Sequence, residues 1–326
     1  MGTVSGTGTT YALPNYHGAL FVVSPVDTPF LSAIGGINGA KVVHSKTWEW
    51  QTIARRASSA NNAALEGQNA PTATNQSRGN VMNITEIHQS AISISYSKMA
   101  AIGQFSGVNI APLEDDVVLD ELQLQTEAEL QSMGVDIEKS FLSGTLQIPA
   151  DNTTARHTQG ILGAIETNLS NVSGDESTVL APAMIDSLLQ TMYTNAAPLN
   201  QETTVLLASA ETALWVSYAY AAQSSLSAPI RDQTIAGVAY KTITTTFGTF
   251  AVMMDRWMPN NELGIIDLSA CYPVFTEVPG KGVLFVEPLA KTGATEQWQL
   301  YGEIGLEWGP ETYHGLLTGF TAPSAP

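Results

Sequence analysis

The feature that most constrains this chain is a pair of β-patterned segments separated by a long polar loop. Residues 41–53 are rich in β-branched and aromatic side chains, and residues 81–97 end in an apolar–polar alternation. Between them, residues 54–80 are mostly small or polar, and Leu65 is the only large apolar side chain. Such a loop cannot bury enough apolar surface within one subunit to offset the entropy lost on ordering. We therefore expect a β-hairpin whose loop is ordered by a neighbouring molecule, which points to a protein that assembles.

The charge of the chain is unevenly distributed. The 326 residues carry a formal net charge of −17, yet residues 1–98 have a balance of +2 and the remainder a balance of −19. This contrast predicts that the N-terminal third of one subunit lies on the acidic surface of a neighbour, although an acidic surface that only confers solubility would give the same numbers. Tight nucleic-acid binding normally needs clustered Lys and Arg, and the sequence has no such cluster.

The sequence carries no recognisable targeting signal. No window of about 18 uninterrupted apolar residues occurs, and the N-terminal residues lack the basic start and apolar stretch of a signal peptide. We therefore expect a soluble protein made in a cytoplasm. The lone Cys271 excludes an internal disulfide and a thiolate metal cluster. Without a secretion signal, we attribute five Asn-x-Ser/Thr sequons to chance; they begin at Asn75, Asn83, Asn152, Asn168 and Asn171.

A long helix is predicted over residues 114–143. The acidic run 114–116 suits the positive end of a helix, and Gly144 is suited to end it. Apolar side chains recur at helical spacing along one stripe, at Val118, Leu122, Leu130, Met133, Ile137 and Phe141. The predicted helix is longer than most helices of globular proteins.

The second half of the chain predicts a small α/β-like lobe followed by strands. A helix over about 182–195, a short buried strand at 203–208 and a helix capped by Ser209 form the lobe. From Val238 onward strand patterns dominate, and the clearest alternation of apolar and polar side chains covers residues 298–308. The fold class is therefore α+β.

The search for catalytic chemistry gives a negative result. The sequence contains no phosphate-binding glycine loop, no His-Glu-x-x-His and no Gly-x-Ser-x-Gly elbow, and its five histidines are scattered. A hard cation at residues 114–116 is an alternative, but helix-start electrostatics is favoured there. A base-stacking platform at Trp48 and Trp50 is another alternative, but anchoring of the hairpin to a neighbouring subunit or to the core is favoured. We expect no catalytic, cofactor or metal site and no enzymatic activity.

The order of these parts resembles the major capsid proteins of tailed bacteriophages, which have the Hong Kong 97-type fold. The resemblance spans essentially the whole chain. Its motifs are structural, so their order carries the specificity. They are Thr28-Pro-Phe-Leu-Ser-Ala-Ile34, Trp48-Glu-Trp50, Leu65-Glu-Gly67, Gly302-Glu-Ile-Gly-Leu-Glu-Trp308 and His314-Gly315.

The resemblance implies a division of the chain into five segments. These are an N-terminal arm over 1–40, an extended loop over 41–97, a peripheral domain over 98–180 that contains the spine helix 114–143, an axial domain over 181–259, and C-terminal strands over 260–326 that complete the peripheral domain. Some proteins with this fold join their subunits through an isopeptide bond from a loop lysine. This sequence has no Lys between Lys46 and Lys98, which predicts non-covalent contacts.

The implied function is self-assembly of hexamers and pentamers into an icosahedral shell that encloses phage double-stranded DNA without binding it specifically. The protein would be part of the virion, assembled in the host bacterial cytoplasm with no membrane. Portal, scaffolding and decoration proteins are partners that such shells can have. A phage tail, decoration or adhesin-type structural protein is the main alternative, and an enzyme with an unrecognised site is another.

Intersubunit contacts are expected at the arm and the hairpin. The apolar candidates are Phe21, Phe30, Trp48, Trp50 and Leu65, and the ion-pair candidates are Arg55, Arg56 and Arg78.

Overall fold

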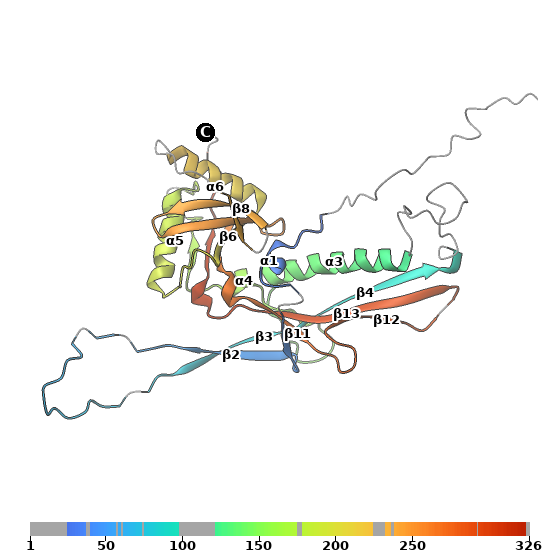
Figure 1. Ribbon diagram of the computed structural model, residues 1–326, viewed down its shortest axis with the longest axis horizontal. Coiled ribbons are helices and arrows are strands. Elements are labelled where there is room, and N and C mark those ends of the chain that lie inside the picture. Colours follow the sequence, from blue (N-terminus) through green and yellow to red (C-terminus); the bar gives the residue numbers. More distant parts are fainter. Residues whose placement is uncertain are drawn as a thin grey trace, which may run out of the picture.

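The computed structural model describes two sheets and the helices that pack on them (Figure 1). The described residues are 25–36, 40–56, 58–59, 61–73, 75–97, 121–174, 178–223, 232–235, 238–291 and 293–323. The predicted start of the long helix, most of the N-terminal arm and Phe21 lie outside these ranges. Within them, no helix has the length and apolar character needed to cross a membrane.

The first sheet has five strands and is centred on the long strand β13 (Thr295–Glu307). β13 pairs antiparallel with β4 (Glu86–Ser95), β11 (Tyr272–Thr276) and β12 (Leu284–Pro288), and β1 (Lys41–Val43) adds parallel to β11. The alternation predicted for residues 298–308 is confirmed from Leu300 onward, because Leu300, Ile304, Leu306 and Trp308 are buried while Tyr301, Glu303 and Glu307 are only partly covered. Trp298, predicted to point inward, is only partly buried.

The long helix α3 (Glu121–Ser143) lies along the ribbon of β4 and β13 (Figure 1). Its predicted stripe is confirmed in its C-terminal half, because Met133, Ile137 and Phe141 are buried against the sheet and the short helices α1 (Pro29–Ala33) and α4 (Ile161–Ala164). Leu122 and Leu130 are only partly buried, and Val118 lies outside the described residues. The helix ends before Gly144 as predicted. A Cβ at Gly144 would lie 2.4 Å from the Ser140 carbonyl oxygen and 2.6 Å from that of Thr158, so only glycine fits there.

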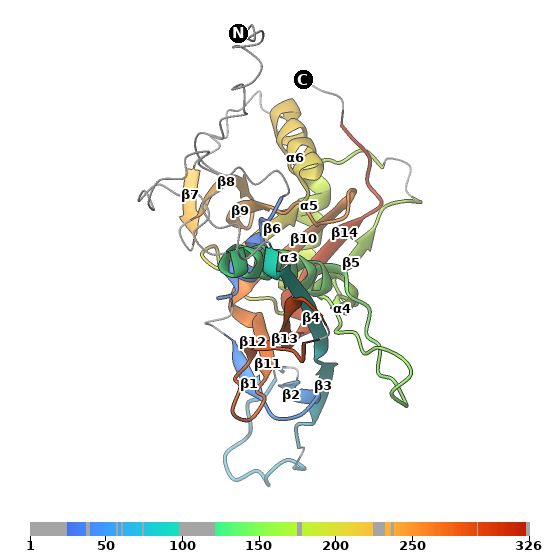
Figure 2. The ribbon, with the colours of Figure 1, turned by 90° about the vertical axis from the view of Figure 1, so that its right-hand side faces the viewer.

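The second sheet has seven strands in the order β5-β14-β10-β6-β9-β8-β7. Figure 2 shows it between α5 and α6 on one side and α3 on the other. The predicted helix–strand–helix is confirmed. Its elements and the other strands are α5 (Pro182–Thr194), β6 (Thr204–Ala208), α6 (Ala210–Gln223), β5 (Leu169–Asn171), β7 (Asp232–Ile235), β8 (Val238–Thr245), β9 (Gly248–Met254), β10 (Glu262–Asp267) and β14 (Gly315–Thr318).

The central strand β6 separates two apolar cores. Val205 and Leu207 pack into the core that contains α3 and the first sheet, whereas Leu206 and Ala208 pack into the core beneath α5 and α6. A strand buried on both faces reads as a continuous apolar run, which explains why its sequence shows no alternation. Three strands of this sheet, β5, β10 and β14, come from outside residues 181–259, so the lobe is larger than the range assigned to it from the sequence. Two one-turn helices, η2 (Leu268–Ala270) and η3 (Glu311–Tyr313), connect strands at its edge.

The predicted hairpin is correct in kind and wrong in extent. Residues 41–53 form two strands, β1 and β2 (Thr47–Ile53), and the second segment likewise divides into β3 (Arg78–Ile84) and β4. The two breaks face each other, because the Thr85 N–H donates to the Lys46 carbonyl oxygen at 2.8 Å. β1 and β4 therefore belong to the five-stranded sheet, and only β2 and β3 form the projecting hairpin.

Candidate intersubunit interface

The hairpin of β2 and β3 projects from the body of the molecule (Figure 1). Its strands pair without interruption from Thr47 opposite Ile84 to Ile53 opposite Arg78. Beyond that last pair, every described residue of the loop 54–77 is exposed, and the side chain of Leu65 is 81% exposed. The loop therefore adds no apolar burial to the fold of its own subunit.

A tight turn lies within the exposed loop at residues 65–68. The Gln68 N–H donates to the Leu65 carbonyl oxygen at 3.1 Å, and the Leu65 N–H donates to Gln68 Oε1 at 3.0 Å. Gly67 has φ +79°, in the left-handed region that favours glycine. The turn holds Leu65 and Glu66 next to each other on the exposed face of the loop.

Two tryptophans fix the base of the hairpin to its own subunit. Trp48 is buried and packs on β13 at Gly305, where a Cβ would lie 2.3 Å from the Trp48 ring. Trp50 lies on the same face of the strand, and its Nε1–H donates to the Gly309 carbonyl oxygen at 2.8 Å. The Trp50 ring also meets Trp308 edge-to-face, with 4.9 Å between ring centroids. The direction in which the hairpin leaves the body is therefore set inside the subunit.

Asn83 connects the same base to two further segments. Its side chain is fully buried, and Nδ2 donates to the Leu306 carbonyl oxygen at 2.6 Å. Its Oδ1 accepts hydrogen bonds from the backbone N–H groups of Ile84 at 2.9 Å and Gln159 at 3.0 Å. In the sequence, Asn83 stands out only as the start of a chance sequon, and its complete burial agrees with that interpretation.

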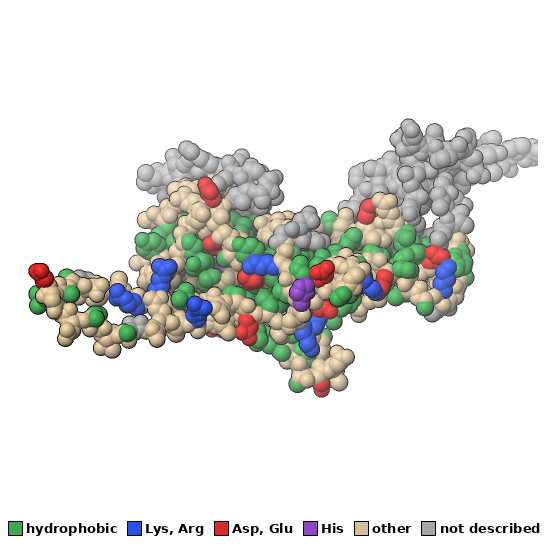
Figure 3. Space-filling model, turned by 60° about the horizontal axis from the view of Figure 1, so that its bottom comes forward, with side chains coloured by type: hydrophobic (Ala, Val, Ile, Leu, Met, Phe, Trp, Pro, Cys, Tyr) green, Lys and Arg blue, Asp and Glu red, His purple; other side chains and the backbone are tan. Residues whose placement is uncertain are grey.

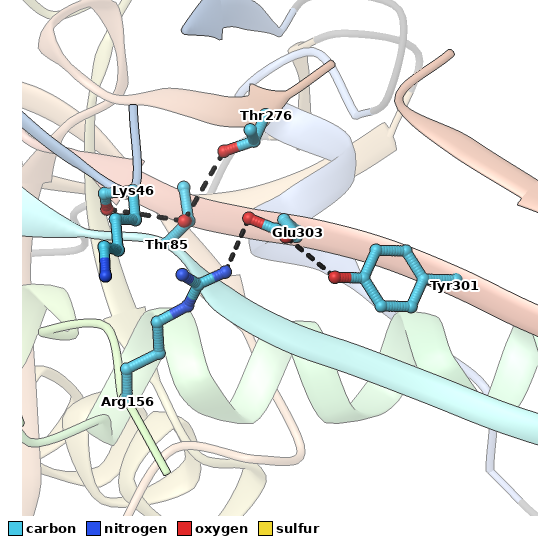
Figure 4. Close-up of polar contacts among 6 residues, drawn as sticks. All are labelled: Lys46, Thr85, Arg156, Thr276, Tyr301 and Glu303. Carbon is cyan, nitrogen blue, oxygen red and sulfur yellow. Dashed lines mark hydrogen bonds and ion pairs between the residues drawn. The ribbon is translucent and has the colours of Figure 1, made fainter. Parts of the chain in front are cut away.

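Polar contacts continue along the outer edge of this base (Figure 4). The Thr85 hydroxyl donates to the Lys46 carbonyl oxygen at 3.4 Å and accepts from the Thr276 hydroxyl at 3.5 Å. Beside them, Arg156 reaches β13 and forms a 2.5 Å ion pair with Glu303, which also accepts a 2.7 Å hydrogen bond from the Tyr301 hydroxyl. Both side chains of the ion pair are mostly buried, so water screens their attraction less than it would on an open surface.

A hollow of about 350 Å³ lies beside these contacts. It is lined by Lys46, Thr47, Ile84, Ile87 and residues 148–156 apart from Thr153. Its carboxylate, Asp151, accepts hydrogen bonds from the hydroxyl and backbone N–H of Thr153, and these bonds lower the pKa of Asp151. The charged side chains of the lining are Lys46, Asp151 and Arg156, and Arg156 is already paired with Glu303.

Comparisons with known proteins agree with this architecture. The family model of the SU10 major capsid protein matches residues 3–321. The chain belongs to this family. A curated major capsid protein of Escherichia phage Phieco32 is 22% identical over 345 residues, covering 92% of each chain.

Solved structures show the same fold at low sequence identity. The capsid asymmetric unit of cyanophage A-1(L) matches with a TM-score of 0.64 at 13% identity, covering 97% of this chain and 99% of that chain. The capsid of a native GTA particle matches with a TM-score of 0.61 at 13% identity, covering 98% and 99%. The α+β fold of Hong Kong 97 type that the sequence predicts is thereby confirmed, and the protein is a phage major capsid protein, the subunit of an icosahedral shell.

The structure divides the candidate contact residues of this capsid protein into two groups. Phe30, Trp48 and Trp50 lie against the core of their own subunit, and Phe30 is fully buried, so its side chain offers no surface to a neighbour. The remaining described candidates are all exposed on the hairpin or its loop; they are Arg55, Arg56, Leu65 and Arg78. Among their contacts, Arg78 Nη1 donates to Gln51 Oε1 at 3.3 Å across the hairpin. Intersubunit contacts of the second group remain a prediction.

Charged side chains are distributed along the projecting hairpin. Figure 3 shows Lys and Arg side chains along the projecting hairpin and an acidic side chain near its end. Glu66 is the only charged residue between Arg56 and Arg78. The hairpin is therefore mildly basic along its length, while the chain as a whole is strongly acidic.

One of the scattered histidines is packed inside the subunit. His314 is fully buried, its Nδ1 accepts from the Asp267 N–H at 3.3 Å, and its Nε2–H donates to the Trp308 carbonyl oxygen at 2.7 Å. Burial lowers the pKa of His314, so the ring is neutral and both nitrogens are used structurally. In the described part of the chain, no three His, Cys, Asp or Glu side chains gather as a metal site would require.

Proposed function

We propose that this capsid protein assembles as hexamers and pentamers, and that the loop 54–77 of each subunit lies on a neighbouring copy. The observation that carries the proposal is the contrast between a loop that is exposed throughout its described length and a hairpin base that is buried and hydrogen-bonded. A chain gains nothing for its own fold by holding 24 loop residues away from its body on a rigid base. A second copy that buries part of that loop would supply the missing stabilisation.

Closed shells need one subunit to make two kinds of ring. A chain that forms both sixfold and fivefold rings must combine a rigid body with contacts that adapt to the angle between subunits. The two packed sheets supply a rigid body, and the long loop supplies a contact that can adapt. The seven-stranded lobe would then serve as the axial domain, at the centre of each ring.

Charge supports the same arrangement. Arg55, Arg56 and Arg78 are exposed on the hairpin, whereas residues 99–326 carry a balance of −19. A neighbour's acidic surface would therefore attract the hairpin. Because the chain has no Lys between Lys46 and Lys98, these contacts would be non-covalent.

The shell would enclose double-stranded DNA without binding it specifically, since an acidic wall repels phosphate groups. The protein would act as a structural component of the virion, with no enzymatic activity. It would be assembled in the host bacterial cytoplasm, together with portal, scaffolding or decoration proteins where the phage encodes them.

Replacement of the loop by a minimal turn tests this proposal. Substituting an Asn-Gly dipeptide for residues 54–77 joins Ile53 to Arg78, and a two-residue turn of this type preserves the pairing of the two strands. The variant should yield a folded subunit with unchanged chemical unfolding, yet negative-stain electron microscopy should find no closed shells.

A length-matched control isolates the role of the loop. The variant S58A/S59A keeps the length and the turn at Leu65 and should form normal shells. Normal shells from the Asn-Gly variant would refute the proposed role of the loop.

A further inference from the structure

Two acidic side chains meet in the interior where α1, α3 and the end of β9 come together. Glu138 lies on α3 and Asp255 directly follows β9, and both are fully buried. The two carboxyl groups lie within hydrogen-bonding reach of each other. Neither residue stands out in the sequence, because a Glu in a helix and an Asp after a strand are usually exposed on the surface.

Glu138 holds the first turn of α1 in place. Its Oε1 accepts the Phe30 N–H and its Oε2 accepts the Leu31 N–H, each at 2.7 Å. Phe30 and Leu31 are themselves buried in the core that contains α3. The carboxyl group of Glu138 therefore joins the segment that precedes the hairpin to the long helix.

Asp255 brings the seven-stranded sheet to the same point. Its backbone N–H donates to the Ala208 carbonyl oxygen at 2.9 Å, and its Oδ1 accepts the Trp257 N–H at 2.8 Å. Its Oδ2 is buried and has no hydrogen-bond donor among the described residues, and the carboxyl group of Asp255 interacts with that of Glu138. Two ionised carboxylates cannot bond to each other, so this contact requires a proton between them.

No cation of the described residues neutralises the pair directly. The Arg256 guanidinium pairs with Asp27 at 3.1 Å on the surface, and the Lys139 ammonium lies over the Trp257 ring, 4.4 Å from its centroid. Trp257 in turn donates from Nε1 to the Asp27 carbonyl oxygen at 2.9 Å. The nearby charges thus form a rim around the pair, and Asp27 adds further negative charge near Asp255.

We propose that Glu138 and Asp255 share one proton, and that this shared proton acts as a latch joining α1, α3 and the turn after β9. With the proton present, Glu138 accepts both backbone N–H groups of α1 and donates the shared hydrogen bond to Asp255. When hydroxide removes the proton to form water, two carboxylates face each other in the interior, and α1 separates from α3 to let water reach them.

The direction of the pH dependence follows from the environment of the pair. Burial, and then the charge of Asp255, raise the pKa of Glu138 to about 9, and burial raises the pKa of Asp255. A carboxyl whose folded-state pKa is raised contributes stability that is fully present below its ordinary range and is lost as the pH rises through the folded value. The latch is therefore closed at neutral and acidic pH and opens at alkaline pH.

Hydrogen exchange at the Phe30 and Leu31 amides measures directly whether the latch is closed, because both amides donate to Glu138. In the full-length unassembled chain, protection of these amides, corrected for intrinsic exchange, should fall at least about tenfold as the pH rises from 7 to 10. The variant D255N supplies a hydrogen-bond donor that does not titrate. Its Asn Nδ2–H can donate to the Glu138 carboxylate, while its Oδ1 still accepts the Trp257 N–H. It should keep its protection across that range.

Two further variants keep the proposal falsifiable. E262Q removes another carboxyl whose pKa is raised by burial, on β10, and should follow the wild-type profile. If D255N does not fold, E138Q serves in its place: its amide accepts only one of the two N–H groups, so protection should be lower at pH 7 but constant with pH. A wild-type profile that is flat, or a profile in D255N or E138Q that falls in parallel with the wild type, would overturn the latch.

Discussion

The loop 54–77 and the base from which it projects belong to one hairpin but obey different constraints. At the base, Trp48 and Asn83 are buried, and each polar atom of the Asn83 side chain has a partner in the same subunit. In the loop, the described side chains are exposed, and Leu65 is the only large apolar one. The fold of the subunit therefore determines the sequence of the base and leaves the sequence of the loop undetermined.

This difference separates the two tasks of a shell subunit. The base must hold the hairpin at a fixed direction, which requires packing at close quarters such as that of Trp48 on Gly305. In the proposed shell, the loop meets another copy whose angle changes between rings, which favours small and polar residues that adapt their hydrogen bonds. Substitutions in the base should act on the stability of the isolated subunit, and substitutions in the loop should act on assembly.

The largest effect on the isolated subunit is expected from W48A. Removal of a buried Trp leaves a cavity between the hairpin and β13, so the free energy of unfolding should fall by about 3–5 kcal/mol in urea titrations of the unassembled chain. L65A should change it by less than about 0.5 kcal/mol, since that side chain is exposed in the subunit. Equal losses in the two variants would remove the distinction between base and loop.

A smaller effect is expected from N83A. The substitution leaves the buried Leu306 carbonyl and the Gln159 N–H without their partner, so unfolding should become easier by about 1–3 kcal/mol. The matched control is N80A on the same strand, whose amide donates only to the exposed Glu49 at 3.0 Å. If N80A proved as destabilising as N83A, burial would not be what distinguishes the base.

The sequence predicted the fold where one local pattern decides the structure. The stripe of Met133, Ile137 and Phe141 and the cap at Ser209, whose Oγ accepts the Thr212 N–H at 3.2 Å, depend on near neighbours in the chain. The break at residues 44–46 was missed because it depends on pairing with Thr85 and on β11, both distant in sequence. Propensity alone reads residues 41–53 as one strand.

The candidate interface could be recognised from the sequence only in its exposed part. The composition of residues 54–80 already shows a segment that cannot pack on itself, and the structure agrees. Asn83, Glu138 and Asp255 gave no usable signal in the sequence, because a buried polar residue is recognised by its hydrogen-bond partners. For Asn83, the partners Gln159 and Leu306 lie 76 and 223 positions away. Phe30, Trp48 and Trp50 were recognised as anchors, and for the two tryptophans the sequence left open whether the hairpin is anchored to a neighbouring subunit or to its own core.

The smallest effect, on assembly alone, is expected from reversal of charge in the loop. R55E/R56E should leave the unfolding of the subunit nearly unchanged and should weaken shell formation at low salt. The deficit should shrink as salt rises, because surface charges are screened beyond about 10 Å at 0.1 M ionic strength. The neutral pair R55Q/R56Q should fall between wild type and reversal in light-scattering assays of assembly, and a deficit that is independent of salt would remove charge attraction from the account.

The most direct test of the account is hydrogen exchange of the loop in two states of the same chain. Amides of residues 58–73 should exchange rapidly in unassembled subunits and become protected in closed shells, while amides at Trp48 and Asn83 should be protected equally in both states. Loop amides that exchange as fast in shells as in free subunits would show that the loop has no partner on a neighbouring copy, and would contradict the central claim.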